Sequence, residues 1–184
     1  ILKSEESFFD IAPANQDLAG AEIDLVGIQD REYMLKNAIN ALKKSYDYIL
    51  IDCPPTLNLL TVNALVAATA VLIPMQCEYY ALEGLSDLVN TIKRVKKQLN
   101  PKIEIEGLLR TLFDKRNTLA QQVSDELSSH FGSKVYKTII PRNVRLAEAP
   151  SHGKAALFYD RSSKGAKAYL ALAEEILKGI HNEK

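Results

Sequence analysis

The chain has 184 residues, of which 47% are hydrophobic, which is enough for one sizeable core; we expect one domain over residues 1–184. Its 23 Lys and Arg residues balance 23 Asp and Glu residues, so any nucleic-acid binding has to come from a local basic patch. No apolar run approaches the roughly 20 residues that span a bilayer, and Cys53 and Cys77 have neither disulfide nor metal-ligand spacing. These features predict a soluble cytoplasmic protein in which both cysteines are buried thiols.

Strands and helices alternate along the sequence. The predicted strands are residues 8–13, 46–51, 71–75, 103–109 and 135–140. The predicted helices are residues 21–44 (N-cap Asp30), 57–68, 82–99, 118–130 (ending at Gly132) and a final helix with Ala166, Tyr169, Leu170, Ala173, Ile176, Leu177 and Ile180 on its packed face. This alternation predicts an α/β fold, a doubly wound and mostly parallel sheet with helices on both faces.

The stretch Tyr46–Pro55 organises the rest of the chain. Its apolar residues lead into Asp52 and two prolines, which indicates a buried parallel strand that ends on a carboxylate. Ligands of open α/β sheets bind at that edge, and P-loop nucleotidases use such an aspartate, the Walker B residue, to hold the water shell of Mg²⁺. An aspartate after a strand is also an ordinary way to begin a turn, so the pattern alone allows both interpretations.

Three longer segments add a specific signal, since Thr56–Leu65, Val71–Leu85 and Ile140–Ser151 occur in this order. With the stretch above, they closely resemble the ParA/Soj family of chromosome- and plasmid-partition ATPases, which implies a ParA/MinD-like P-loop NTPase fold. The 184 residues contain no phosphate loop of the form GxxxxGK[ST]. In the family this loop and its strand precede the matching region. The chain therefore resembles the C-terminal two-thirds of one incomplete domain, and alone it is expected to be inactive.

The resemblance also implies roles for particular residues. Asp52 corresponds to the Walker B carboxylate, which contacts Mg²⁺ through water. Pro141 and Asn143 lie in the segment that lines the adenine and ribose of ATP. Arg116 and Arg145 match arginines that bind DNA without sequence preference, although an isolated surface arginine is more often an ion-pair partner. A basic run on the predicted 82–99 helix could flank that patch or simply be a solvated face: Lys93, Arg94, Lys96 and Lys97.

The function implied by the resemblance is DNA segregation by a cytoplasmic, nucleoid-associated ATPase. Such a protein would use ATP and Mg²⁺, form a homodimer on ATP, bind DNA nonspecifically and be stimulated by a ParB-type protein. A MinD-like membrane ATPase would need a basic amphipathic tail, which residues 178–184 do not supply, and an iron-protein-like carrier would need more ligand cysteines. A non-enzymatic binding module that has lost its nucleotide site is the remaining alternative.

Overall fold

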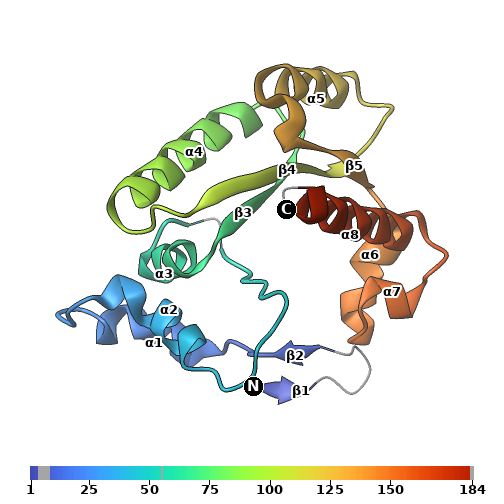
Figure 1. Cartoon of the computed structure of the whole chain (residues 1–184). Helices are drawn as coiled ribbons and strands as arrows, with labels where there is room; N and C mark the ends of the chain where they lie inside the picture. The colour runs from blue at the N-terminus through green and yellow to red at the C-terminus, as the bar shows by residue number, and fades with distance from the viewer. Residues whose placement is uncertain (4–8, 55, 183–184) are drawn as a thin grey trace. The chain divides into compact units, whose positions relative to one another are not determined.

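The computed structural model describes residues 1–3, 9–54 and 56–182, and the chain forms two compact units, Ile1–Ala68 and Thr69–Lys184 (Figure 1). Phe8 and Pro55, which belong to two of the predicted elements, lie outside the described residues.

The first unit combines a two-stranded antiparallel sheet with short helices. Its elements are β1 (Leu2–Lys3), β2 (Asp10–Ile11), α1 (Gln16–Asp24), the 3-10 helix η1 (Arg31–Tyr33), α2 (Met34–Asn40) and α3 (Leu59–Ala67). The strand predicted over residues 8–13 is confirmed only at β2, which pairs with β1. A single helix over residues 21–44 is wrong, because Gly27 and Asp30 have φ angles of 86° and 56°, which a right-handed helix excludes. Asp30 does occupy the N-cap position of η1, but its side chain makes no capping hydrogen bond.

Asn63 holds the helices of the first unit together. It is 3% exposed, and its Nδ2 donates to the carbonyls of Arg31 (2.9 Å) and Leu59 (3.0 Å). Its Oδ1 accepts from the backbone N–H of Leu35 at 3.1 Å. The buried amide thus links α3 to η1 and α2, and each of its polar atoms has a partner.

The buried strand predicted within Tyr46–Pro55 is not formed. Residues 45–54 have no strand conformation, and Tyr48, Ile49 and Leu50 are 52%, 48% and 94% exposed. A strand needs a neighbour to satisfy its backbone N–H and C=O groups, and no strand of the described residues pairs with this segment. Cys53, which was expected to be buried, is exposed for the same reason, whereas Cys77 is buried as predicted.

The second unit is a parallel sheet covered by helices. Its elements are β3 (Ala70–Gln76), α4 (Ala81–Gln98), β4 (Glu104–Phe113), α5 (Thr118–Phe131), η2 (Gly132–Lys134), β5 (Val135–Pro141), α6 (Val144–Glu148), η3 (Ala149–His152), α7 (Ala156–Tyr159) and α8 (Lys164–Asn182). The strand order is β3-β4-β5, and both pairs are parallel, with Leu108 opposite Ile73 on one side and Val135 on the other. Helices α4 and α5 cover one face and α8 covers the other (Figure 1), which confirms the predicted layered architecture.

Helix α8 buries the predicted stripe only in part. Ala166 is 1% exposed and Ile176 packs against the sheet, as predicted, and the side chain of Ile180 lies outside what the structure describes. The buried cluster on its side of the sheet contains Leu109, Tyr136, Ile140 and Leu172, with Leu72, Leu146, Ala168 and Ile176 packed against it. Tyr169, Leu170 and Leu177, which were predicted to pack, are 46%, 37% and 43% exposed. The helix carries apolar residues on adjacent stripes, so periodicity indicates amphipathicity without selecting which stripe meets the sheet.

Arg110 is an unusual charged residue in the middle of the sheet. It projects from β4 toward α5, where its Nη1 donates to Ser124 Oγ at 2.9 Å, while its Nη2 donates to the Tyr136 carbonyl of β5 at 2.5 Å. One side chain therefore links β4, β5 and α5.

Candidate functional site

The carboxyl ends of the three parallel strands form one edge of the second unit. The strands β3, β4 and β5 end at this edge with Gln76, Phe113 and Pro141. Ligands of open parallel sheets bind outside this edge because the loops there diverge. A pocket of about 250 Å³ lies at it, lined by Gln76, Cys77, Glu78, Leu112, Phe113, Asp114, Asn117, Ala120 and Arg142.

The loop after β4 is shaped by side-chain hydrogen bonds. Asn117 caps α5, since its Oδ1 accepts from the N–H groups of Leu119 (3.0 Å) and Ala120 (3.3 Å). Asp114 accepts two bonds from the Arg116 guanidinium, at 3.0 and 2.8 Å, and a third from its backbone N–H at 3.0 Å. The Arg116 side chain holds the pKa of Asp114 at about 2. Arg116 is nevertheless 90% exposed in its side chain, so its outer face is open to a ligand.

Asn143 follows β5 and carries an unsatisfied acceptor. It occupies the N-cap position of α6, yet its side chain makes no capping bond. Its Oδ1 is buried and has no hydrogen-bond partner among the described residues. A buried acceptor without a donor costs free energy, so this oxygen is suited to receive a donor from a bound molecule.

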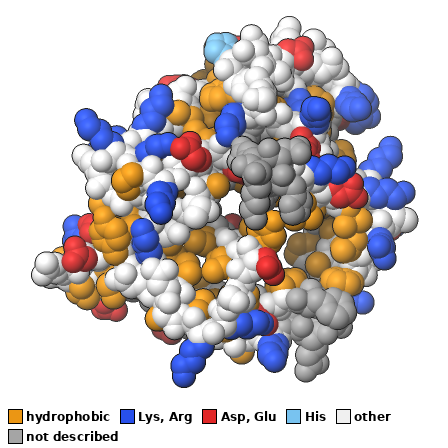
Figure 2. Space-filling view, viewed as in Figure 1, with side chains coloured by type: hydrophobic (Ala, Val, Ile, Leu, Met, Phe, Trp, Pro, Cys, Tyr) orange, Lys and Arg blue, Asp and Glu red, His pale blue; other side chains and the backbone are white. Residues whose placement is uncertain are grey.

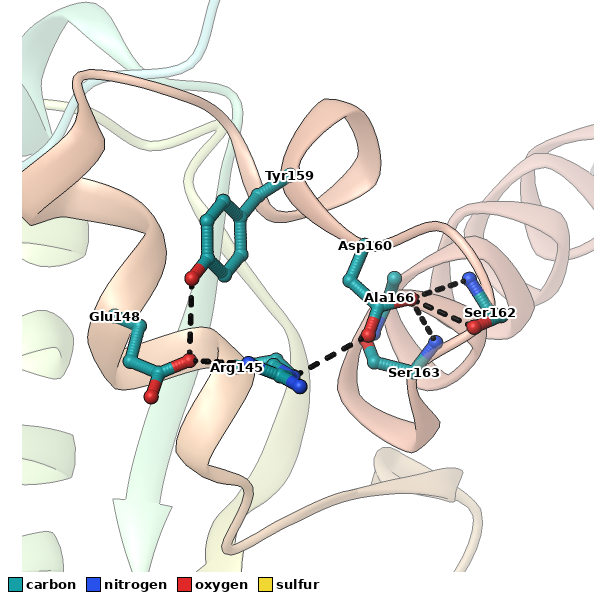
Figure 3. Close-up of polar contacts among 7 residues, drawn as sticks. All are labelled: Arg145, Glu148, Tyr159, Asp160, Ser162, Ser163 and Ala166. Carbon is teal, nitrogen blue, oxygen red and sulfur yellow. Dashed lines mark hydrogen bonds and ion pairs between the residues drawn. The ribbon is translucent and has the colours of Figure 1, made fainter.

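Arg145 lies two residues farther on, in α6, and faces two carboxylates (Figure 3). Its Nη1 donates to Glu148 Oε2 at 2.9 Å, and its Nε lies 3.5 Å from Asp160 Oδ2. Glu148 raises the pKa of the Arg145 guanidinium above its ordinary value. These residues line a second, wider pocket of about 660 Å³, together with Arg142, Asn143, Val144, Ser163 and Lys164.

Asp52 belongs to the first unit, Ile1–Ala68. Its carboxylate is exposed in the irregular segment before α3. No group of three or more His, Cys, Asp or Glu side chains that could hold a metal occurs in the part of the chain that the structure describes. A single exposed carboxylate can still hold Mg²⁺ through a water shell, because this ion keeps several of its waters in protein sites. Asp52 therefore fits outer-shell contact to Mg²⁺ and does not by itself form a metal cage.

The structure brings four of the five predicted site residues to the second unit. Pro141 ends β5, Asn143 and Arg145 follow it within four residues at the start of α6, and Arg116 comes from the loop after the neighbouring strand β4. Sequence reasoning missed Arg142, which lines both pockets and donates its backbone N–H to the Phe113 carbonyl at 3.1 Å. The run from Ile140 to Arg145 contains it, but only the pairing of β4 with β5 shows that it lies between the two pockets.

Glu148 and Asp160 were also missed as partners of Arg145. The spacing of three residues between Arg145 and Glu148 on a short helix is a signal that could have identified the first pair. Asp160 could not have been identified in this way, because it is fifteen positions away along the chain and reaches Arg145 through the fold.

Charge on the molecular surface is mixed. On the face shown in the space-filling view, Lys and Arg side chains are scattered among Asp and Glu side chains and apolar patches of the described residues (Figure 2). The basic run of α4 is also partly engaged, since Lys96 forms an ion pair with Glu104. A nucleic-acid surface on this protein would accordingly have to be a small local patch.

Comparison with known proteins identifies the family. A family model described as an AAA domain matches residues 1–105. Sporulation initiation inhibitor protein Soj of Bacillus subtilis is 58% identical over 167 residues, which are 91% of this chain and 66% of that protein. Chromosome partitioning protein ParA of Caulobacter vibrioides is 51% identical over 178 residues, which are 96% of this chain and 67% of that protein. The chain belongs to the ParA/Soj family.

A solved structure agrees with this family assignment. The cobyrinic acid a,c-diamide synthase of Mycobacterium smegmatis, crystallised with an ATP analog and magnesium, has a TM-score of 0.79 and 37% identity, covering 94% of this chain and 64% of that one. The fold is thus that of the ParA- and MinD-like P-loop NTPases. The 184-residue chain spans about two thirds of the length of the curated relatives that it matches. Within the described residues, no helix is both long and apolar enough to cross a membrane.

Proposed function

We propose that the protein to which this chain belongs is a DNA-partition ATPase. It binds ATP and Mg²⁺, forms a homodimer on ATP, binds DNA without sequence preference and is stimulated by a ParB-type protein, all in the cytoplasm at the nucleoid. The observation that carries the proposal is the 58% and 51% identity to Soj and ParA across more than nine tenths of the chain. This similarity includes the segments at the carboxyl edge of the sheet where ligands of such folds bind.

The nucleotide part of the proposal assigns the segment after β5 to the base and ribose of ATP. The unpartnered Asn143 Oδ1 supports it, because adenine offers an amino group that could donate to this buried acceptor. Pro141, the last residue of β5, stands two positions before Asn143, and the resemblance to the family assigns it to the same base-lining segment. When bound, Mg²⁺ supplies neutralisation of phosphate charge. Asp52 would orient the water shell of the ion.

The DNA part assigns Arg116 and Arg145 to phosphate contacts. Their side chains are 90% and 53% exposed, and each is a guanidinium that can form paired hydrogen bonds with phosphate oxygens. Their ion pairs with neighbouring carboxylates lie at the surface, where such pairs contribute little free energy and can be exchanged.

A salt series tests the DNA assignment. Duplexes of unrelated sequence are titrated with the whole protein in Mg-ATP, comparing wild type with Arg116→Glu and Arg145→Glu. The slope of log affinity against log salt is negative, and each lost phosphate contact should reduce its magnitude by about 0.9, equally for all duplexes. Lys102→Glu makes the same charge change in the turn that precedes β4, at the opposite end of the strand, and serves as the control. If all four proteins show one slope and one affinity, these arginines are ordinary surface charges.

A further inference from the structure

Arg145 is held by a set of acidic contacts that its proposed role does not require. Glu148 Oε2 accepts from Arg145 Nη1 at 2.9 Å and also from the Tyr159 hydroxyl at 3.3 Å, so two donors converge on one oxygen (Figure 3). Asp160 Oδ2 lies on the other side of the guanidinium, 3.5 Å from Nε. A single positive charge is thus flanked by two negative ones, and this trio carries a net charge of about −1.

The two carboxylates differ in how firmly they are anchored. Asp160 Oδ1 accepts from the backbone N–H groups of Ser162 (3.0 Å) and Ser163 (3.1 Å) and from Ser162 Oγ at 2.7 Å. Ser163 in turn caps α8 by accepting from the Ala166 N–H at 3.1 Å. Asp160 therefore cannot turn away without disturbing the start of α8. The Glu148 side chain bonds only to Arg145 and Tyr159 among the contacts of the described residues, so it is the part that can move.

We propose that Glu148, supported by Asp160, competes with DNA phosphate for the Arg145 guanidinium and so limits the DNA affinity of the protein. This inference rests on the proposed function, because it assumes that Arg145 contacts DNA. An approaching phosphate has to displace the Glu148 carboxylate from the Arg145 guanidinium or share the guanidinium with it. In both cases the negative carboxylate repels the negative phosphate.

The charges that line the wider pocket set the direction of the effect. Arg142, Arg145 and Lys164 contribute three positive charges there, and Glu148 and Asp160 contribute two negative ones. The pocket is therefore positive by only one charge, and neutralising Glu148 would double that excess. A phosphate roughly 5 Å from the former carboxylate, in a water-like dielectric, would then bind about fourfold more tightly.

Glu148→Gln is the decisive variant. Glutamine keeps an oxygen that can accept from both Arg145 and Tyr159, so the fold of this region should survive while the charge is lost. Affinity for one 30-base-pair duplex, in Mg-ATP and low salt, is measured for the whole protein as wild type, Glu148→Gln, Arg145→Ala and the double variant. Glu126→Gln, an exposed residue in the second half of α5, makes the same change in net charge and is the matched control.

The proposal expects Glu148→Gln to bind DNA about fourfold more tightly than wild type, Glu126→Gln to differ little from wild type, and the gain to disappear in the double variant. If Arg145→Ala weakens binding but Glu148→Gln is no tighter than Glu126→Gln, or is weaker than wild type, then the competition does not exist and the carboxylate only positions the arginine. If Arg145→Ala binds as wild type does, the DNA contact itself is wrong and the competition falls with it.

Discussion

Removing the Glu175 carboxylate tests how the edge strand of the sheet is held. Glu175 projects from α8 and accepts from two backbone N–H groups of β5, those of Lys137 at 2.7 Å and Thr138 at 2.9 Å. Hydrogen bonds to charged groups contribute about 1.5–3 kcal/mol each, and Glu175→Gln keeps one acceptor while turning an amide NH₂ toward the other N–H. With a discount for partial exposure, the free energy of unfolding should fall by about 2 kcal/mol, out of a total of about 5–15 kcal/mol.

The same contact predicts a dependence on pH. Burial raises the pKa of Glu175, but the hydrogen bonds from Thr138 and Lys137 outweigh it, so the pKa lies below its ordinary value of 4.5. A carboxyl group whose pKa is lowered by folding stabilises the folded state above the unfolded pKa and loses this contribution as the pH falls through the folded pKa. The difference between wild type and Glu175→Gln should therefore be full at pH 7 and should shrink as the pH falls below about 4.5.

Urea unfolding of the whole protein at a series of pH values measures both effects. Glu174→Gln, on the same helix, is the control, because Glu174 is 73% exposed and its carboxylate lies 3.9 Å from Lys178. Equal stabilities of wild type, Glu175→Gln and Glu174→Gln at pH 7 would show that the two N–H groups of β5 are satisfied by water just as well. A difference that does not change with pH would show that the carboxylate charge has no part in it.

Three further changes have defined outcomes. Asn63→Ala should lower the free energy of unfolding by about 2–3 kcal/mol, measured by urea unfolding, because the N–H of Leu35 loses a buried acceptor. Gly165→Ala should lower it by about 1 kcal/mol, since the new Cβ would lie 2.4 Å from Leu146 Cγ. Leu146→Ala removes that clash at its own packing cost, so in thermal unfolding Gly165→Ala should lower the stability of wild type but not that of the Leu146→Ala variant. Asp52→Ala should abolish phosphate release by the whole protein without changing its unfolding temperature, and unchanged turnover with normal magnesium dependence would make Asp52 a turn residue.

The sequence predicted the elements of the second unit well because their signals are local. Helices α4 and α5 have long amphipathic repeats and clear ends, at Asn100–Pro101 and Gly132. The strands β3 and β5 have the short apolar runs that were predicted, whereas β4 continues to Phe113, four residues beyond its predicted end. Their alternation also predicted that the strands are parallel, since two strands joined by a crossing helix normally run in the same direction. Motif order along the chain then identified the family before any geometry was known.

Tertiary structure decided what depends on partners that are distant in sequence. Whether Tyr48 to Ile51 form a strand depends on a neighbouring strand and not on their apolar character, and the described residues supply none. Which stripe of α8 is buried depends on the side chains of β4 and β5 that it meets. The ion pair between Arg145 and Asp160 likewise joins two loops that only the fold brings together. Periodicity and motif spacing carry information about a residue's own element, whereas ladders, packed faces and electrostatic partners are properties of pairs of elements.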